Sequence, residues 1–133
     1  MRRLTKITVA TLGMAGLALT VPAFAQPALT MLDGLKRGAW ELKYRDGTPP
    51  RRICVRSGRE FIRLRHPGGD CNRFVVEDAK NGVTVQYTCR GDGYGRTNIR
   101  RESAELVQVD SQGIQGGRPF QFSLEARYAG ACR

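Results

Sequence analysis

The sequence predicts an all-β protein, an antiparallel meander of about seven strands that curls into a sandwich or barrel. Three observations lead to this fold class. Apolar and polar residues alternate in several short runs, which is the period of a strand with one buried face. Turn-forming residues separate these runs at short intervals. No helical pattern in the sequence is long enough for the crossover connection that a parallel sheet requires.

The strands are expected at residues 40–44, 51–56, 72–78, 83–89, 96–102, 105–110 and 120–128. The first shows the pattern most simply, because Trp40, Leu42 and Tyr44 alternate with charged residues. The Asn81-Gly82 pair between the third and fourth strands is a strong signal for a tight hairpin. Residues 26–37 lack such a pattern and are expected to form a loose arm.

One short helix is expected near residues 58–65. Ser57 and Glu60 have the spacing of a capping box, in which the two side chains satisfy backbone N–H groups at the start of a helix. Apolar residues follow them directly, and Pro67-Gly68-Gly69 then ends the segment.

The first 25 residues predict a secretory signal peptide. Basic residues begin the chain, an uncharged apolar run of about fifteen residues follows, and small residues lead up to Ala25. An uncleaved membrane anchor would need roughly twenty apolar residues. We therefore expect cleavage between Ala25 and Gln26, which leaves residues 26–133 as a single disulfide-bonded β domain in the periplasm or outside the cell.

Four cysteines, Cys54, Cys71, Cys89 and Cys132, predict two disulfides in an oxidising compartment. A structural zinc site would bring its ligands in close pairs, whereas 16, 17 and 42 residues separate these cysteines. We therefore expect no metal site.

Strand parity favours one of the three possible disulfide pairings. Cys89 and Cys132 are in phase with the apolar residues of their strands, so both are expected to face the core. Cys54 is out of phase with residues 53 and 55, and Cys71 is out of phase with residues 74 and 76, so both cysteines are expected on the opposite face of their strands. Since cysteines on like faces pair, we predict bonds from Cys54 to Cys71 and from Cys89 to Cys132.

The glycine-rich stretch at Gly91, Gly93 and Gly95 predicts a hairpin loop. A dinucleotide-binding motif would lead into a helix whose N-terminus holds the phosphate, but the residues that follow here have the pattern of a strand.

The single histidine limits the catalytic schemes that are possible. A serine or cysteine triad needs a histidine base, and His66 precedes Pro67 in a loop where we expect an exposed structural histidine. The twelve acidic residues are scattered and form no recognisable pair. We therefore expect no enzymatic activity and no cofactor.

Positive charge is the strongest remaining feature of the sequence. Residues 26–133 contain 19 Lys and Arg against 12 Asp and Glu, a net charge of +7. Arginines gather between residues 51 and 65, where Glu60 is the only acid. Guanidinium groups match phosphate and carboxylate groups bidentately. We predict an anion-binding site formed by Arg52, Arg56, Arg59, Arg63 and Arg65.

Export favours envelope components as partners, namely anionic lipid headgroups, an acidic glycan or an acidic protein, and it disfavours nucleic acid. The expected function is thus a non-enzymatic binding or accessory domain. Two alternatives remain open. Arginine outnumbers lysine 16 to 3 in residues 26–133, so the cluster can reflect composition in a structural domain that has no ligand. A carrier of a small apolar ligand would need a hollow sheet interior.

Several of these features occur together in an exported bacterial family, the domain of unknown function 3617. The chain resembles it in the Gly38-Ala39-Trp40-Glu41 opening, in its four cysteines, and in the Tyr87-Thr88-Cys89 strand end followed by a glycine loop. The resemblance covers nearly all of residues 26–133. It implies a small exported β-rich domain with no assigned activity. The chain departs from the family's usual pattern in the short connection, residues 46–50, after the first strand.

Overall fold

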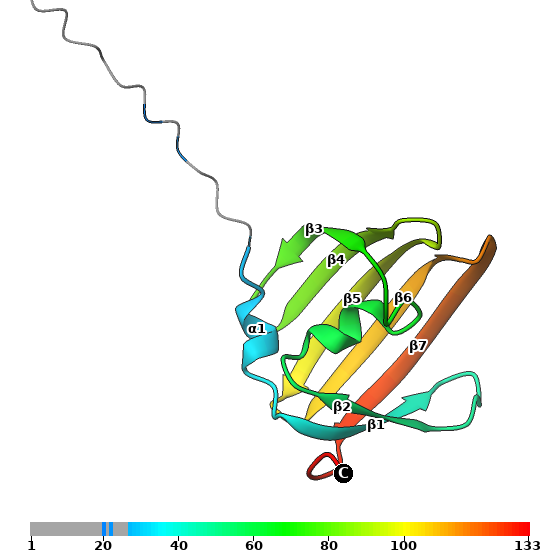
Figure 1. Ribbon diagram of the computed structural model, residues 1–133. Coiled ribbons are helices and arrows are strands. Elements are labelled where there is room, and N and C mark those ends of the chain that lie inside the picture. Colours follow the sequence, from blue (N-terminus) through cyan, green and yellow to red (C-terminus); the bar gives the residue numbers. More distant parts are fainter. Residues whose placement is uncertain (1–19, 21, 23–26) are drawn as a thin grey trace, which may run out of the picture.

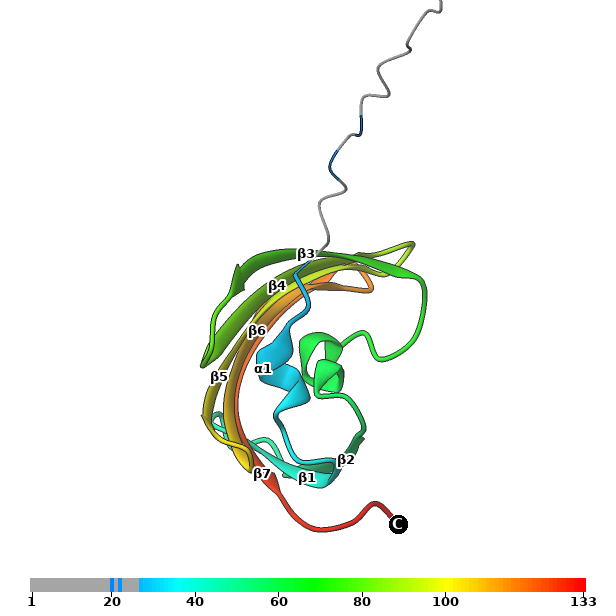
Figure 2. The same ribbon diagram turned by 90° about the vertical axis from the view of Figure 1, so that its left-hand side faces the viewer.

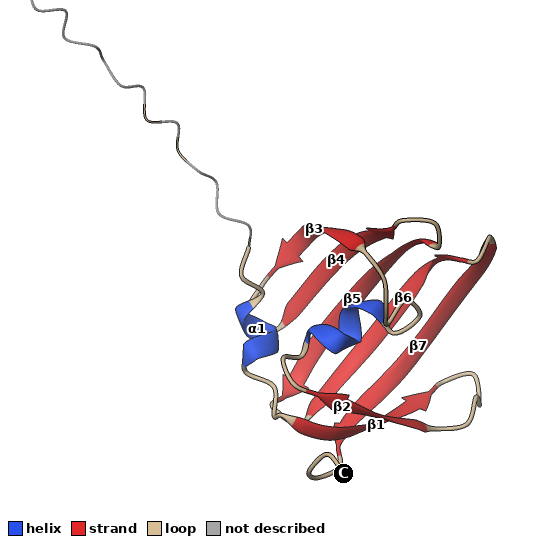
Figure 3. Ribbon diagram, viewed as in Figure 1, coloured by secondary structure: helices blue, strands red, loops and turns tan. Residues whose placement is uncertain are grey.

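The computed structural model describes residues 20, 22 and 27–133 (Figure 1). The predicted cleavage site between Ala25 and Gln26 lies outside the described residues, as does the rest of the predicted leader apart from residues 20 and 22. The described residues form strands, one short α-helix and one 3-10 helix (Figure 3).

Seven antiparallel strands form one sheet, which confirms the predicted all-β fold class. They are β1 (Gly38–Tyr44), β2 (Arg51–Val55), β3 (Cys71–Asp78), β4 (Gly82–Cys89), β5 (Gly93–Ser103), β6 (Leu106–Gln115) and β7 (Arg118–Tyr128). From β3 to β7 each strand pairs with the next one along the chain. The β1–β2 hairpin joins the other side of β7, so the strand order is β2-β1-β7-β6-β5-β4-β3.

The sheet curls strongly but does not close (Figure 2). Strands β2 and β3 are its two edges, and the connection between them, residues 56–70, passes over the concave side of the sheet. This connection contains the 3-10 helix η1 (Arg59–Arg63), which lies where the short helix was predicted. The predicted curling is therefore present, but the sheet is open between β2 and β3 and forms no closed barrel.

Apolar side chains fill the concave side of the sheet. Trp40 of β1 and Phe61 of η1 are completely buried, and their rings meet edge to face with centroids 5.3 Å apart. Strands β4 to β7 contribute further buried side chains, including Val83, Val85, Tyr87, Ile99, Val107, Val109, Phe122 and Leu124. The space that a carrier would keep for an apolar ligand is therefore occupied by the protein's own side chains.

The segment before β1 is not the loose arm that the sequence predicts. It forms the helix α1 (Thr30–Asp33), which lies with η1 inside the curve of the sheet (Figure 2). Its buried side chains are Leu29, Met31, Leu32 and Leu35. The N–H of Leu29 donates to Oδ2 of Asp78 at the end of β3, over 3.2 Å. The prediction was wrong because these apolar residues have no strand period and acquire their place only by packing on the sheet.

The predicted disulfide pairing is wrong, since Cys71 bonds to Cys89 and Cys54 bonds to Cys132. The β3–β4 register places Cys71 directly opposite Cys89, with the Cα atoms 4.0 Å apart. The predicted pairing would require the apolar residues of β3 to face the core. In fact Phe74 is 68% exposed and Val76 42% exposed. Because β3 is an edge strand with an apolar outer face, Cys71 points to the same inner side as Cys89.

The second disulfide depends on the chain beyond β7. Cys54 is exposed, as predicted, but Cys132 does not continue the phase of β7, which ends at Tyr128. The tail turns back along β1, where the N–H of Ala39 donates to the carbonyl of Gly130 over 2.8 Å. Ala39 is paired with Cys54 in the β1–β2 register. The tail therefore brings Cys132 to Cys54, with the Cα atoms 5.6 Å apart.

Candidate functional site

The five arginines of the predicted site do not line one common pocket. Arg52 lies on β2, and its Nε is 3.7 Å from a carboxylate oxygen of Glu41. The guanidinium of Arg65 lies over the rings of Phe120 and Phe122, at 5.7 and 5.9 Å from their centroids. Cation–π contacts of this kind hold a guanidinium on an aromatic surface. These two arginines are therefore engaged at separate places on the sheet.

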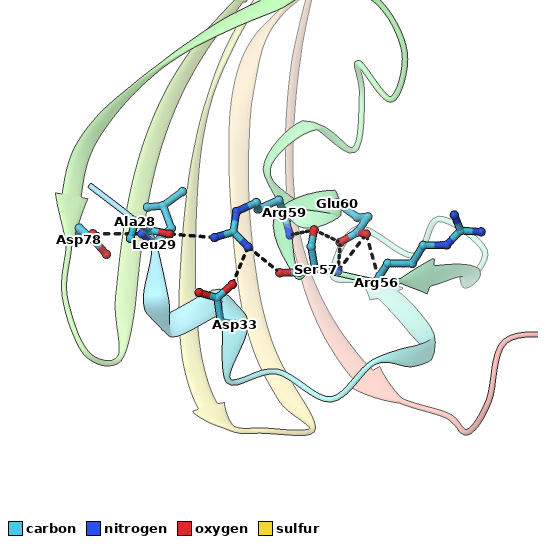
Figure 4. Close-up of polar contacts among 8 residues, drawn as sticks. All are labelled: Ala28, Leu29, Asp33, Arg56, Ser57, Arg59, Glu60 and Asp78. Atoms are coloured by element: carbon cyan, nitrogen blue, oxygen red, sulfur yellow. Dashed lines mark hydrogen bonds and ion pairs between the residues drawn. The ribbon is translucent and has the colours of Figure 1, made fainter. Parts of the chain in front are cut away.

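Arg59 holds η1 to the N-terminal segment (Figure 4). One guanidinium nitrogen donates to Oδ1 of Asp33 over 2.7 Å and to the carbonyl of Ser57 over 3.1 Å. The other donates to the carbonyl of Ala28 over 2.8 Å. The hydrogen bond from Arg59 holds the pKa of the Asp33 carboxyl below its ordinary value, although partial desolvation opposes this. With its donors engaged in this way, Arg59 has a structural role.

Glu60 forms one half of the predicted capping box (Figure 4). The Ser57 hydroxyl accepts from the N–H of Arg59 over 3.3 Å instead of from that of Glu60, and η1 follows Gly58, which provides no side-chain cap. Its carboxylate accepts hydrogen bonds from the backbone N–H groups of Arg56 and Ser57, at 2.8 and 3.2 Å. Burial acts to raise the pKa of Glu60, but the backbone hydrogen bonds lower it further than burial raises it. The carboxylate is thus ionised and saturated by local donors. The Arg56 side chain, by contrast, extends into solvent.

A cleft of about 460 Å³ lies between η1 and the start of β3. Its charged lining residues are Arg59, Glu60, Arg63 and Arg73, three arginines against one glutamate. Arg63 is half-buried and its Nη1 donates to Sγ of Cys71 over 2.8 Å, whereas Arg73 is exposed. Within residues 27–133, no carboxylate forms an ion pair with Arg63 or Arg73. Of the three arginines that line the cleft, these two are therefore the ones without a carboxylate partner.

Arg73 was missed by reasoning from the sequence. It lies outside the cluster of arginines between residues 51 and 65, and it reaches the cleft only because β3 packs beside η1. Residues two apart in a strand lie on the same face, so Arg73 lies on the same face of β3 as Cys71. A correct prediction of the Cys71–Cys89 bond would therefore have indicated on which face of β3 Arg73 lies.

His66 is not the exposed histidine that the sequence predicts, because only 1% of it is accessible. Its Nε2 is 3.1 Å from the carbonyl oxygen of Asp92 and its Nδ1 is 2.9 Å from the hydroxyl oxygen of Tyr87. A carbonyl can only accept a hydrogen bond, so Nε2 carries a proton. Both ring nitrogens are therefore engaged inside the fold.

The glycine-rich stretch is a hairpin, as predicted. It joins β4 to β5 through the pair of Cys89 with Gly93, and Gly91 in the turn has a φ of 79°, which favours glycine. Gly95 lies opposite Tyr87 within β5. A Cβ atom at Gly95 would be 2.4 Å from the Tyr87 hydroxyl oxygen. The glycine therefore makes room for the phenol that bonds to the histidine.

Burial raises the pKa of Tyr87 to about 12. The folded state favours the neutral phenol of Tyr87, so the tyrosine contributes to the free energy of unfolding. This contribution is complete below pH 10 and is lost as the pH rises through about 12. Between pH 10 and 12 we expect the unfolding free energy of the wild type to fall by about 1–2 kcal/mol more than that of Tyr87→Phe. Urea unfolding of both proteins at several pH values measures the difference. Parallel pH profiles for the two proteins would contradict the expectation.

Two further properties concern the described part of the chain. None of its helices is both long and apolar enough to cross a membrane. Residues 20, 22 and 27–133 also contain no group of three or more His, Cys, Asp or Glu side chains that could hold a metal ion.

Comparison with known proteins found no matching family model, no matching curated protein and no matching solved structure. The resemblance to the domain of unknown function 3617 therefore stays a prediction from the sequence.

Proposed function

We propose that this protein is an exported, non-enzymatic binding module that contacts an anionic component of the cell envelope through the cleft between η1 and β3. The observation that carries the proposal is that two guanidinium groups without a carboxylate partner among the described residues, those of Arg63 and Arg73, line one cleft. Planar guanidinium groups bind phosphate and carboxylate by paired, charge-assisted hydrogen bonds. The net charge of +7 over residues 26–133 adds a long-range attraction for anions.

Other observations favour this proposal over its alternatives. The two disulfides fit a protein of the periplasm or the cell exterior. A carrier of a small apolar ligand is disfavoured, because Trp40, Phe61 and the other core side chains occupy the concave side of the sheet. A catalytic role for His66 is also disfavoured, since both of its ring nitrogens are engaged in the fold.

Binding to phosphatidylglycerol vesicles tests the cleft. We expect the wild type to bind at low salt and to be released as salt rises, because the contact is electrostatic. Replacing both cleft arginines, as Arg63→Gln/Arg73→Gln, should weaken binding about tenfold or more, since each removes a charge-assisted contact. Cosedimentation at a series of salt concentrations measures this.

The matched control is Arg100→Gln/Arg118→Gln, which removes the same charge at two exposed positions outside the cleft. We expect it to weaken vesicle binding by less than about threefold. An equal loss in both double variants would contradict the cleft and would favour the alternative that the arginines are a compositional bias. Glycerol phosphate added as a soluble competitor shows whether the phosphate group suffices for recognition.

A further inference from the structure

The outer face of the sheet carries a groove of about 850 Å³ that spans strands β3 to β7. One cross-strand row of side chains runs along it, and the strand registers place the members of this row opposite one another: Phe74, Gln86, Arg96, Gln112 and Gln121. A neighbouring row adds Asn72, Thr88 and Tyr94. The groove therefore lies on the side of the sheet opposite the filled core.

The aromatic residues of the groove are exposed to an unusual degree. Phe74 is 68% exposed and Tyr94 is 55% exposed. They are two of the three large apolar side chains that the described part of the chain exposes, and Val76, two residues after Phe74 on β3, is the third. Exposed apolar groups that gather in one place mark a contact surface more often than those scattered singly.

The polar residues of the groove differ from those elsewhere on the same outer face. Away from the groove the side chains bond to one another, as Gln108 does with Arg45 and Glu125 at 2.6 and 3.1 Å. Within the groove the side chains of Gln86, Gln112, Gln121 and Arg96 form no hydrogen bond with any other described residue. Unengaged carboxamides in the same row as Phe74, with Tyr94 in the neighbouring row, leave both donors and acceptors for a ligand.

We propose that this groove binds an acidic polysaccharide, a chain of sugars that bears carboxylates. Carboxamides both donate and accept, so they match the neighbouring hydroxyl groups of a sugar, and aromatic rings pack on its apolar face. No Asp or Glu lines the groove, whose charged residues are Arg73 and Arg96. This charge selects an anionic polymer over a neutral one. Arg73 lines both this groove and the cleft beside η1, but the proposal rests on the two rings, the carboxamides and Arg96, none of which lines that cleft.

Two other macromolecules fit the groove less well. An extended peptide that adds a strand needs free backbone groups at a sheet edge, but the groove lies mainly over β4 to β7, each of which pairs on both sides. Single-stranded nucleic acid needs a groove dense in positive charge along its backbone. Here three glutamines accompany Arg96 in the central row.

Affinity electrophoresis of the full mature chain in gels that contain polygalacturonate tests the proposal, with uncharged dextran as the neutral reference. We expect retardation by polygalacturonate and little by dextran. Phe74→Ala and Tyr94→Ala should each weaken binding tenfold or more, whereas Val76→Ala, an exposed neighbour outside the groove lining, should change it less than twofold. Arg96→Gln should also weaken binding, whereas Arg100→Gln on the same strand should not.

The contradicting outcomes are equally specific. Absence of binding overturns the proposal, as does a loss that is the same in Arg96→Gln and Arg100→Gln, because the attraction would then be general charge. A single-stranded oligonucleotide that binds in a Tyr94-dependent way more tightly than polygalacturonate also overturns it. Arg63→Gln separates this groove from the cleft: it should impair vesicle binding and leave polygalacturonate binding within twofold. The urea midpoint of each variant shows whether the fold is intact.

Discussion

The Cys54→Ser/Cys132→Ser variant is expected to lose about 4 kcal/mol of its unfolding free energy. The bond joins residues 78 positions apart in the chain, so it removes a large part of the conformational freedom of the unfolded state. It also ties the short edge strand β2 to the tail beyond β7. Since single domains have only about 5–15 kcal/mol of stability, this loss should leave a marginally folded protein. Urea unfolding followed by circular dichroism measures it.

The second disulfide is the matched control for the first. Cys71 and Cys89 are 18 positions apart, and the same chain-entropy argument gives a loss of about 3 kcal/mol for Cys71→Ser/Cys89→Ser. The order of the two losses is therefore part of the prediction, and a larger loss for the shorter loop would contradict it. Peptide mapping without reduction should yield a Cys54–Cys132 peptide, and a Cys54–Cys71 peptide would show that the pairing described above is incorrect.

Trp40→Ala is expected to lower the unfolding free energy by about 3–5 kcal/mol. The indole is completely buried, packs edge to face on Phe61 and Tyr128, and donates from Nε1 to the carbonyl of Lys36 over 2.9 Å. Truncation removes these contacts and opens a cavity where β1, β7 and η1 meet. Because the chain has only one tryptophan, unfolding of the variants has to be followed by circular dichroism rather than by indole fluorescence.

Trp40→Phe separates packing from hydrogen bonding at this position. A phenyl ring keeps much of the apolar contact but leaves the Lys36 carbonyl without its indole donor, so the expected loss is about 1–2 kcal/mol. Equal losses in Trp40→Ala and Trp40→Phe would mean that packing around the ring contributes little. That result would contradict the position of Trp40 at the centre of the core.

Much of the fold could be predicted from the sequence, because the signals are local. The alternation of Trp40, Leu42 and Tyr44 predicts β1, and the Asn81-Gly82 pair predicts the β3–β4 hairpin, in which β4 begins at Gly82. The spacing of Ser57 and Glu60 predicts a short helix at this place, and η1 is found there with the Ser57 N–H donating to the Glu60 carboxylate. Each signal lies within a few residues of the structure that it predicts.

The sulfur pairing could not be predicted in this way. On β3 the apolar residues Phe74 and Val76 face solvent. Their alternation correctly predicts a strand, but it predicts the wrong face of that strand to be buried. Which face of an edge strand is buried depends on what covers it, and this is decided by elements far away in the chain. The same holds for Cys132, which follows the path of the tail rather than the phase of β7.

The candidate site was predicted only in part, for a related reason. A cluster of arginines in the sequence indicates positive charge, but it does not show which guanidinium groups find partners. Arg59 bonds to Asp33, which lies 26 positions earlier, and Arg65 lies over rings of β7. Arg63 is left unpaired, and Arg73 joins it from outside the cluster. Only the packing of η1 against the sheet separates structural arginines from those free to bind.

The sequence by itself determined the fold class, the places of the strands and turns, and the place of the short helix, because alternation and turn chemistry act between neighbouring residues. Tertiary structure decided the disulfide partners, the burial of His66 and the arginines that remain free. These depend on contacts between distant segments, such as that of His66 with Asp92, 26 positions along the chain. A contact of this kind exists only once the sheet has curled around its two helices.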